Sequence, residues 1–264
     1  MKRLLIVAGS DSGGGAGIQA DIKTATMHGV FAMTAVTAIT VQDTRGVHGV
    51  HVIPDEAIAD QMAACLIDIG ADAVKTGMLA SAGTIETVAR VLERHAPDVP
   101  LVVDPVMVAK GGARLIDETA VAAMKTHLFP RAAVITPNLP EAAALLEMDE
   151  IADVVGMEAA GQGLLAFGPR AVLMKGGHLP GGQVTDLLIT RAGMSRFDGP
   201  RIESRSTHGT GCTLASAIAS GLAQGLALSD AVAAGRVYVT RAIETAPGLG
   251  HGHGPLNHMH GLTS

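Results

Sequence analysis

The sequence predicts an α/β protein in which a mainly parallel sheet lies between two layers of helices. Short apolar runs rich in valine and isoleucine recur along the chain, and each is too short for a typical helix. Amphipathic stretches, with apolar residues three and four positions apart, separate most of these runs. Such alternation is typical of right-handed crossovers between parallel strands. Because 48% of the residues are hydrophobic, we expect one packed domain over residues 1–264.

The expected elements follow one another in a regular order. Buried strands are predicted at residues 4–8, 34–41, 72–76, 101–103, 133–136 and 171–174. Helices are predicted at residues 16–29, 55–70, 83–95 and 117–129.

Two segments depart from this alternation. In "RGVHGVHVIP", residues 45–54, valine alternates with other residues, which predicts a half-exposed strand that forms a small flap and a candidate lid. Residues 183–190 and 194–202 flank "RAG", a spacing that predicts a hairpin and therefore an antiparallel edge to the sheet.

The composition argues against several classes of protein. A net charge of −6, with no Trp, one Tyr and four Phe, disfavours binding to nucleic acid. The first apolar run ends at Gly9, which is too short for a signal peptide or a membrane span. Cys65 and Cys212 lack the spacing of a disulfide framework or a zinc site. We therefore expect a cytoplasmic protein with no nucleic-acid or membrane partner.

Polar residues gather directly after the expected strands, where parallel sheets bind their ligands. The segments concerned are "GSDSGGGAG", Gln42 with Asp43, "TGM", "DPVM", "TPN" and "KGGH". The glycine loop at residues 13–17 has two interpretations: its N–H groups hold a phosphate or admit a substrate closely, or it is only a tight turn. The dinucleotide glycine motif and the Walker motif are both absent from the sequence.

The segment "HGTGCT" predicts an anion cradle at the start of a helix. Gly209 and Gly211 permit backbone conformations in which successive N–H groups point into one concavity, a geometry that suits a phosphoryl group. A helix start also lowers the pKa of a thiol, so we expect Cys212 to be a thiolate that accepts a proton from a substrate hydroxyl. The alternatives are a small buried core cysteine, or a cysteine hydrolase that uses Cys212 with His208.

Several motifs together resemble one known family. They are "AGSDSGGGAGIQADIKT", "DPVMVAKGG", "ITPNLPEAAALL", "VLMKGGH", "THGTGCTLASAIA" and "GHGPLNHMH". In these motifs, which span essentially the whole chain, the sequence resembles the hydroxymethylpyrimidine/phosphomethylpyrimidine kinases of thiamine biosynthesis, members of the ribokinase-like superfamily. The resemblance implies a ribokinase-like three-layer αβα sandwich, ATP and Mg²⁺ as cofactors, and a homodimer formed around residues 45–53.

The resemblance also implies a reaction and a pyrimidine pocket. The reaction is ATP-dependent phosphorylation of 4-amino-5-hydroxymethyl-2-methylpyrimidine, and then of its monophosphate to the diphosphate. The implied anion hole consists of Gly209, Thr210, Gly211 and Cys212, with Cys212 as the base. Asp21, Gln42 and Met78 are implied to bind the ring. The Gln42 amide has the donors and the acceptor that pair with a ring nitrogen and an exocyclic amine.

For the nucleotide half of the site, "NLPE" matches the N-x-x-E signature of the superfamily. Asn138 and Lys175 are thereby implied to bind ATP, and Asp104 and Glu141 to act on the metal through its waters. A helix cap at Asn138 and a strand-end turn at Asp104 are the alternatives that involve no ligand.

Two further readings of the function stay open at this point. Some relatives that carry "GTGC" phosphorylate pyridoxal, although Gln42 favours an aminopyrimidine. The second alternative, after pyridoxal phosphorylation, is a pyrimidine-binding module without catalysis, and the intact cradle and N-x-x-E signature argue against it. The four histidines of "HGHGPLNHMH" are interpreted as structural rather than as a metal site.

Overall fold

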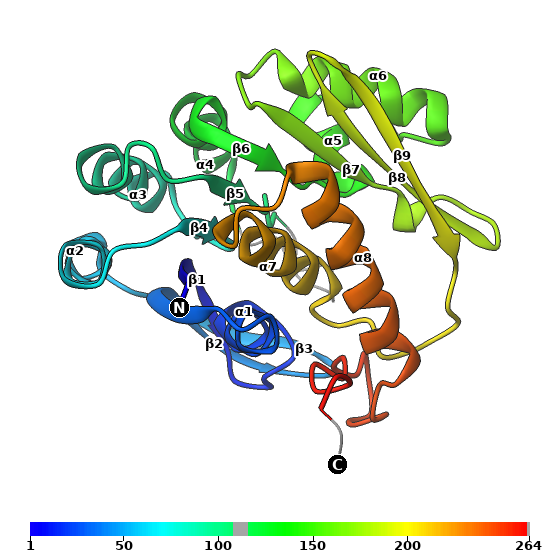
Figure 1. The fold of residues 1–264 in the computed structure, drawn as a ribbon, viewed down its shortest axis with the longest axis horizontal. Coiled ribbons are helices and arrows are strands. Elements are labelled where there is room, and N and C mark those ends of the chain that lie inside the picture. The colour runs from blue at the N-terminus through cyan, green and yellow to red at the C-terminus, as the bar shows by residue number, and fades with distance from the viewer. Residues whose placement is uncertain (108–115, 263–264) are drawn as a thin grey trace.

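The computed structural model describes residues 1–107 and 116–262, and in these residues nine strands form one sheet (Figure 1). The strands are β1 (Arg3–Asp11), β2 (Phe31–Asp43), β3 (Gly46–Val52), β4 (Ala73–Thr76), β5 (Leu101–Val103), β6 (Ala132–Ile135), β7 (Ala171–Lys175), β8 (Gln183–Thr190) and β9 (Gly193–Pro200). Their order in the sheet is β3-β2-β1-β4-β5-β6-β7-β8-β9. Strands β2, β1, β4, β5, β6 and β7 pair in parallel in that order, whereas β3, β8 and β9 pair antiparallel at the two edges.

Helices cover both faces of this sheet. One face is covered by α1 (Gly17–Met27), α7 (Thr210–Ala223) and α8 (Leu228–Glu244), and Figure 1 shows α7 and α8 side by side. The other face is covered by α2 (Asp55–Asp68), α3 (Ala82–His95), α4 (Glu118–Ala123), α5 (Leu139–Leu146) and α6 (Val154–Leu165). Short turns of other helix types are η1 (Met124–Leu128), η2 (Phe129–Arg131) and η3 (Gly176–His178).

Strand β1 shows why a continuous apolar run marks a central strand. Leu5 and Val7 pack into the core beneath α2 and α3, whereas Leu4 and Ile6 pack against the layer that contains α7. All four side chains are fully buried. Burial of each contributes roughly 1.5–3 kcal/mol, so a strand with helices on both faces has little room for polar residues.

The fold class predicted from the sequence is confirmed, including the antiparallel edge and the flap. Strand β3 is the flap segment, and it lies antiparallel to β2 at the edge of the sheet. In the β8–β9 hairpin Gly193 already pairs with Thr190, so the loop is one residue shorter than "RAG". The helix expected at residues 117–129 is α-helical only to Ala123 and continues as the π turn η1. The end of "DPVMVAKGG", residues 108–112, lies outside the described residues.

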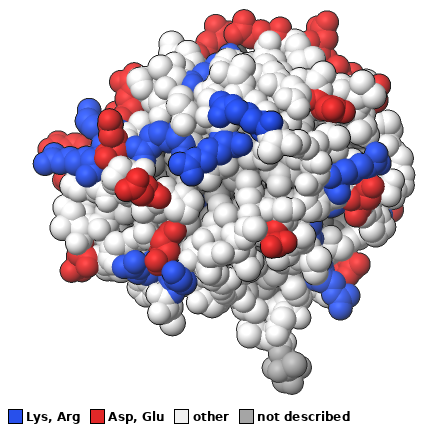
Figure 2. Space-filling model, turned by 45° about the horizontal axis from the view of Figure 1, so that its top comes forward, with Lys and Arg blue, Asp and Glu red and all other residues white. Residues whose placement is uncertain are grey.

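The surface matches the modest net charge of the sequence. On the face drawn in Figure 2, Lys and Arg side chains are interspersed with Asp and Glu, and large areas carry no charge. Within the part of the chain that the structure describes, no helix is both long enough and apolar enough to cross a membrane.

The histidine-rich C-terminal segment is packed against the helix layer. The Tyr238 hydroxyl donates to the backbone oxygen of His258 at 2.8 Å, and Nε2 of His258 lies 3.1 Å from Oγ1 of Thr213. The His258 side chain is only 3% exposed. Burial, helped by Lys23 and His260, lowers the pKa of His258 to about 4. The His258 contact therefore ties this segment to the first turn of α7, whereas His251 and His253 are exposed, and the structural interpretation of all four histidines stays a prediction.

We expect His258 to make the fold sensitive to mild acid. The unfolded chain takes up a proton near the ordinary pKa of about 6.5, whereas the folded state resists it down to about 4. The free energy of unfolding should therefore fall as the pH drops through this window, by about 2 kcal/mol between pH 7.5 and 5 from this residue alone. Glu141, whose pKa burial raises to about 7, contributes in the opposite direction, so urea denaturation of the parent protein and of His258→Gln at both pH values measures the His258 loss as a difference. In His258→Gln the loss should be smaller, while the exposed control His51→Gln should keep it; equal acid sensitivity in all three proteins would contradict the prediction.

Candidate active site

The amino end of α7 faces the carboxyl ends of β5 and β7. A Cβ atom placed on Gly211 would lie 3.3 Å from Nζ of Lys175 and 3.7 Å from Oδ2 of Asp104. Asp104 directly follows β5, and Lys175 is the last residue of β7. The structure thus brings together three residues that are far apart in the sequence, at the edge of the sheet where parallel folds bind ligands.

Gly209 sets the geometry of the helix start. It is the N-cap of α7 and has φ of 82°, a left-handed conformation that favours glycine. A Cβ atom there would also lie 1.8 Å from the backbone oxygen of Gly15, so no other residue fits. The first intrahelical bond runs from Thr213 N to Gly209 O at 2.9 Å. Among the hydrogen bonds of the described residues, none uses the backbone N–H of Gly209, Gly211 or Cys212.

The amides at the start of α7 are therefore unbonded, as the predicted cradle requires. Such groups at a helix start carry partial positive charge and favour an anion. Thr210 differs from its neighbours, because its N–H points back to Thr207 O at a distance of 3.5 Å. The role of Gly209, Thr210, Gly211 and Cys212 as an anion hole stays a prediction.

The expectation that Cys212 is a thiolate is wrong. Burial raises the pKa of its thiol to about 11, and the nearby carboxylates of Asp21 and Asp104 act in the same direction. Lys75 and the N–H of Gly17 oppose this shift without cancelling it. Although Cys212 is only partly buried, the loss of solvation around its sulfur outweighs the effect of the helix start on the thiol pKa. At neutral pH the side chain is a neutral thiol.

A buried ion pair lies beneath the cradle. Nζ of Lys75 donates to both carboxylate oxygens of Asp21, at 3.0 and 2.8 Å, and Oγ of Ser216 donates to the same carboxylate at 2.7 Å. Both charged side chains have no exposed surface. Burial alone would lower the pKa of Lys75, but the carboxylates of Asp21 and Asp104 outweigh it and raise the pKa, so the ammonium stays charged.

This ion pair changes the interpretation of Asp21 and adds a residue that sequence reasoning missed. In this structure the Asp21 carboxylate is enclosed and bonded to protein groups, so it is not open to a ligand; its assignment to the pyrimidine pocket stays a prediction. Lys75 lies within the apolar run that forms β4, so it was not recognised as a site residue. A single charge within a run of four buried residues is the signal that could have found it.

On the nucleotide side, Lys175 lies between two acidic residues. Its Nζ donates to Oδ1 of Asp104 at 3.0 Å and lies 3.9 Å from Oε2 of Glu141. Oγ1 of Thr136 donates to the same Asp104 oxygen at 2.9 Å. Burial raises the pKa of Glu141 to about 7 although Lys175 opposes this, whereas Lys175 and Lys75 overcome burial to lower the pKa of Asp104.

The two interpretations of Asn138 are compatible. Asn138 and Glu141 form a reciprocal capping box at the start of α5, in which each side chain accepts from the other residue's backbone N–H at 2.8 Å. The cap holds Glu141 beside Lys175. Asn138 has therefore a structural role in placing the acidic residue, and contact of its side chain with ATP stays a prediction.

The donor set fits Mg²⁺ only in part. Within the described residues, no three His, Cys, Asp or Glu side chains lie close enough to hold a metal ion together. Mg²⁺ is usually bound through one or two carboxylates, with waters and phosphate oxygens completing the octahedron. Asp104 and Glu141 therefore suit a metal that arrives with a nucleotide rather than one held by protein groups alone.

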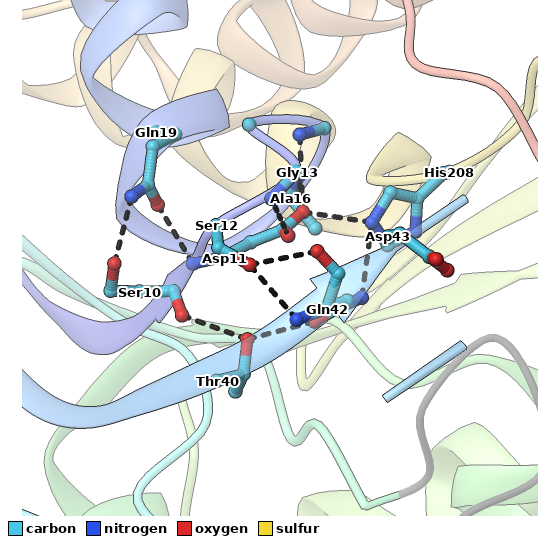
Figure 3. A network of polar contacts seen from close by, with 12 residues as sticks. Ser10, Asp11, Ser12, Gly13, Ala16, Gln19, Thr40, Gln42, Asp43 and His208 are labelled. Atoms are coloured by element: carbon cyan, nitrogen blue, oxygen red, sulfur yellow. Dashed lines mark hydrogen bonds and ion pairs between the residues drawn. The ribbon is translucent and has the colours of Figure 1, made fainter. Parts of the chain in front are cut away.

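The glycine loop is not a phosphate cradle. Figure 3 shows that it wraps around Asp11, whose carboxylate accepts the backbone N–H groups of Gly13 at 2.8 Å, Gly15 at 3.1 Å and Ala16 at 2.8 Å. Because these amides already have an acceptor, the alternative in which they bind a phosphate is wrong. The loop is a tight turn whose close contact with Gly209 positions the start of α7.

Gln42 and Met78 lie on either side of β1. The Gln42 side chain, near the end of β2, has its Nε2 3.1 Å from Nε2 of His208 and its Oε1 3.0 Å from Oγ1 of Thr40 (Figure 3). Met78 follows β4 and is 8% exposed. Its Cε lies 2.7 Å from where a Cβ of Gly9 would be, so this glycine makes room for the methionine. That Gln42 and Met78 bind a ring stays a prediction.

Comparison with known proteins assigns the family. A family model described as phosphomethylpyrimidine kinase matches residues 11–257. The chain belongs to this kinase family. It is 49% identical, over 97% of its length and 93% of the other protein, to the hydroxymethylpyrimidine/phosphomethylpyrimidine kinase of Streptomyces coelicolor.

Two further relatives bear on the function of this kinase. The thiamine biosynthesis bifunctional protein of Geobacter sulfurreducens is 53% identical over 97% of the chain, which spans about half (52%) of that protein. The ADP complex of Bacillus subtilis pyridoxal kinase superposes with a TM-score of 0.91 at 36% identity, covering 98% of each chain. The two relatives named as kinases thus differ in the ring that their names give, hydroxymethylpyrimidine or pyridoxal, and the one solved with ADP shares the fold of this chain.

Breaking the buried ion pair should strongly destabilise the protein. We expect Asp21→Asn to lower the free energy of unfolding by about 3–5 kcal/mol, because Lys75 is left as a buried charge without a partner. Urea denaturation of this variant and of the exposed control Asp60→Asn measures the difference. The double variant Asp21→Asn with Lys75→Met should recover part of the loss. An Asp21→Asn protein as stable as the Asp60→Asn control would show that the pair carries no such cost.

Proposed function

We propose that this kinase phosphorylates 4-amino-5-hydroxymethyl-2-methylpyrimidine with ATP, and then phosphorylates the monophosphate to the diphosphate. The observation that carries the proposal is the set of unbonded amides at the start of α7, beside Lys175 and Asp104. The family membership and the names of the relatives support the same activity. The second step requires the same cradle to accept a substrate that already carries a phosphate.

In the proposed mechanism, the cradle holds the phosphoryl group while it moves from ATP to the alcohol. The N–H groups of Gly209, Gly211 and Cys212 bind its equatorial oxygens, and the Lys175 ammonium neutralises charge on the nucleotide side. These donors are fixed by the fold before the substrate arrives, so little reorganisation accompanies the transfer. Mg²⁺, held beside Asp104 and Glu141 by way of its waters, would supply further charge neutralisation on the phosphates when it is bound.

The high pKa of Cys212 limits its part in the reaction. A neutral thiol cannot accept the hydroxyl proton until the sulfur has lost its own, although a thiolate with a pKa of about 11 is then a strong base. In a loose transition state the hydroxyl proton leaves late, and with a neutral thiol it passes to an oxygen of the transferred phosphoryl group or to solvent as ADP leaves. We therefore assign most of the rate acceleration to positioning and charge stabilisation, and keep Cys212 as the residue next to the reacting hydroxyl.

Each alternative function is opposed by a specific feature of the site. Pyridoxal phosphorylation is the nearest, given the likeness to the Bacillus subtilis enzyme, but the carboxamide of Gln42 provides the paired donor and acceptor that an aminopyrimidine requires. A cysteine hydrolase needs an activated thiolate, and the Cys212 thiol is neutral. A binding module without catalysis would have no need for Lys175 and Glu141 beside the cradle.

We also propose a homodimer formed through the flap. Strand β3 is the last strand at its edge of the sheet and pairs with β2 on one side only. Valine and isoleucine side chains on these two strands are unusually exposed for their type, namely Ile39, Val41, Val50 and Val52. An exposed edge strand with apolar side chains pairs readily with a second copy. A dimer of this kind would protect both features.

Turnover on the two ring alcohols tests the proposed function. In a coupled assay with ATP and Mg²⁺, we expect kcat/KM for the aminopyrimidine alcohol to exceed that for pyridoxal at least about tenfold.

Gln42→Leu should reduce kcat/KM for the aminopyrimidine by roughly 10–100-fold, because polar ring atoms lose their partners. Cys212→Ala should lower kcat while the affinity for the ring stays close to that of the parent protein. A strong preference for pyridoxal would overturn the substrate assignment, and near-parental turnover of Cys212→Ala would remove the cysteine from the reaction.

Sedimentation equilibrium tests the dimer. We expect the parent protein to sediment as a dimer and Val50→Lys to shift it towards the monomer, because a charge would enter the proposed interface. Val155→Lys, an equally apolar but remote and exposed position on α6, is the matched control and should leave the dimer intact. A parent protein that stays monomeric at micromolar concentration would contradict this proposal.

A further inference from the structure

Four side chains form a continuous row from the glycine loop to the end of β2 (Figure 3). Nε2 of His208 lies 2.9 Å from Oδ2 of Asp11 and 3.1 Å from the Gln42 amide, whose other end lies 3.0 Å from Oγ1 of Thr40. Thr40 in turn donates to the backbone oxygen of Ser10 at 2.9 Å. His208 and Asp11 are 7% and 3% exposed, so these contacts are shielded from water.

Asp11 determines where the His208 proton must be. Its carboxylate accepts three backbone N–H groups, and these bonds with the contact to His208 lower its pKa against the opposing effect of burial, so it is ionised. An ionised carboxylate offers only acceptors. Nε2 of His208, at 2.9 Å, must therefore carry a proton and donate it to Asp11. An Nε2 that donates to Asp11 has no lone pair left for the N–H of an amide.

Thr40 imposes the complementary condition at the other end of the amide. A hydroxyl has one proton, and that of Thr40 is used on the backbone oxygen of Ser10. Towards Gln42 the Thr40 oxygen can then only accept. With Nε2 of Gln42 on His208 and Oε1 on Thr40, donor would face donor at one end and acceptor would face acceptor at the other. A turn of 180° about the last side-chain bond exchanges the two atoms. The NH₂ group then donates to Thr40, and the oxygen shares the Nε2–H of His208 with Asp11 in a three-centre hydrogen bond, so the donor–donor and acceptor–acceptor contacts are both removed.

We propose that His208, held by Asp11, is a positioning residue that fixes the orientation of the Gln42 amide, with the oxygen towards His208 and the NH₂ group towards Thr40. The inference rests on the proposed function, because it takes Gln42 as the group that binds the ring. Ser12 adds to the fixation, since its hydroxyl donates to the backbone oxygen of Gln42 at 2.7 Å and accepts the backbone N–H at 2.9 Å. The base of the side chain and the direction of its amide are thus both set before a ligand binds.

The orientation has a direct consequence for specificity. After the contacts with His208 and Thr40, the amide keeps one oxygen lone pair and one N–H for a ligand, in a fixed order. A 4-aminopyrimidine presents an amine donor beside a ring-nitrogen acceptor, and matches that order. The 4-oxo analogue presents a carbonyl acceptor beside a ring N–H donor, which is the reverse pattern. Only an amide that is free to turn can pair equally well with both rings.

The protonation of His208 can be read in the parent protein without any substitution. Long-range ¹⁵N–¹H correlation spectra of ¹⁵N-labelled protein at pH 7.5 distinguish a protonated from an unprotonated Nε2. We expect the Nε2 of His208 to be protonated. An unprotonated Nε2 would overturn the proposal, because the Gln42 N–H group would then have its acceptor. This measurement requires no turnover, so it tests the amide orientation even if the proposed function fails.

A ratio of activities tests the consequence. We expect the parent protein to prefer the 4-amino alcohol over its 4-oxo analogue by at least about 100-fold in kcat/KM. His208→Leu should reduce this preference at least about tenfold, chiefly through KM, because the amide can then turn towards the wrong ring. His127→Leu replaces an exposed histidine on η1 and should leave the preference unchanged. A His208→Leu protein that loses activity on both rings by the same factor would show a structural role only and overturn the proposal.

Thr40→Val provides a second variant for the case in which His208→Leu fails to fold. It removes the acceptor at the NH₂ end of the amide while it keeps the size and branching of the side chain. The preference for the 4-amino ring should again fall, by a smaller factor, since His208 still holds the oxygen. An unchanged preference in Thr40→Val, measured on folded protein, would contradict the orientation assigned to the amide.

Discussion

The contact between the glycine loop and the first residue of the α7 cap is the constraint on which the site depends. The backbone oxygen of Gly15 lies where any side chain at position 209 would have to be. This contact requires glycine at that position, with φ of 82°, and so fixes where α7 begins and where the unpaired amides of its first turn lie. The glycine loop is itself shaped by Asp11, which accepts three of its N–H groups. A carboxylate at the end of β1 thus organises the anion cradle without being part of it.

The sheet could be predicted from the sequence, and the reason is the continuous burial of its central strands. With helices on both faces, β1, β5 and β7 become uninterrupted apolar runs, and the polar residues after them fall at one edge by topology alone. The edge strands could also be predicted, because valine alternates with other residues in β3 and a short turn separates the two strands of the β8–β9 hairpin.

The parts that sequence reasoning missed depend on contacts between distant segments. Lys75 and Asp21 are 54 positions apart, and Gln42 and His208 are 166 apart, so no local pattern reveals either pair. The glycine loop was open to two interpretations because a local motif does not show that Asp11 occupies its amides. The predicted lowering of the Cys212 pKa was wrong for a related reason. A helix start can be recognised in a sequence, whereas the loss of solvation at a given sulfur is a property of the packed structure.

The charges around the cradle explain why a neutral thiol suits this position. Lys75 and Lys175 are balanced by Asp21 and Asp104, which leaves the buried groups close to neutral before any ligand binds. A thiolate at Cys212 would add a further negative charge at the place where phosphate oxygens must enter. The same carboxylates that raise the thiol pKa therefore prevent this, and they leave the backbone amides and Lys175 as the groups that face the incoming anion. Under the proposed mechanism, a neutral sulfur favours entry of the phosphate oxygens, but the cysteine is then not an ionised base at neutral pH.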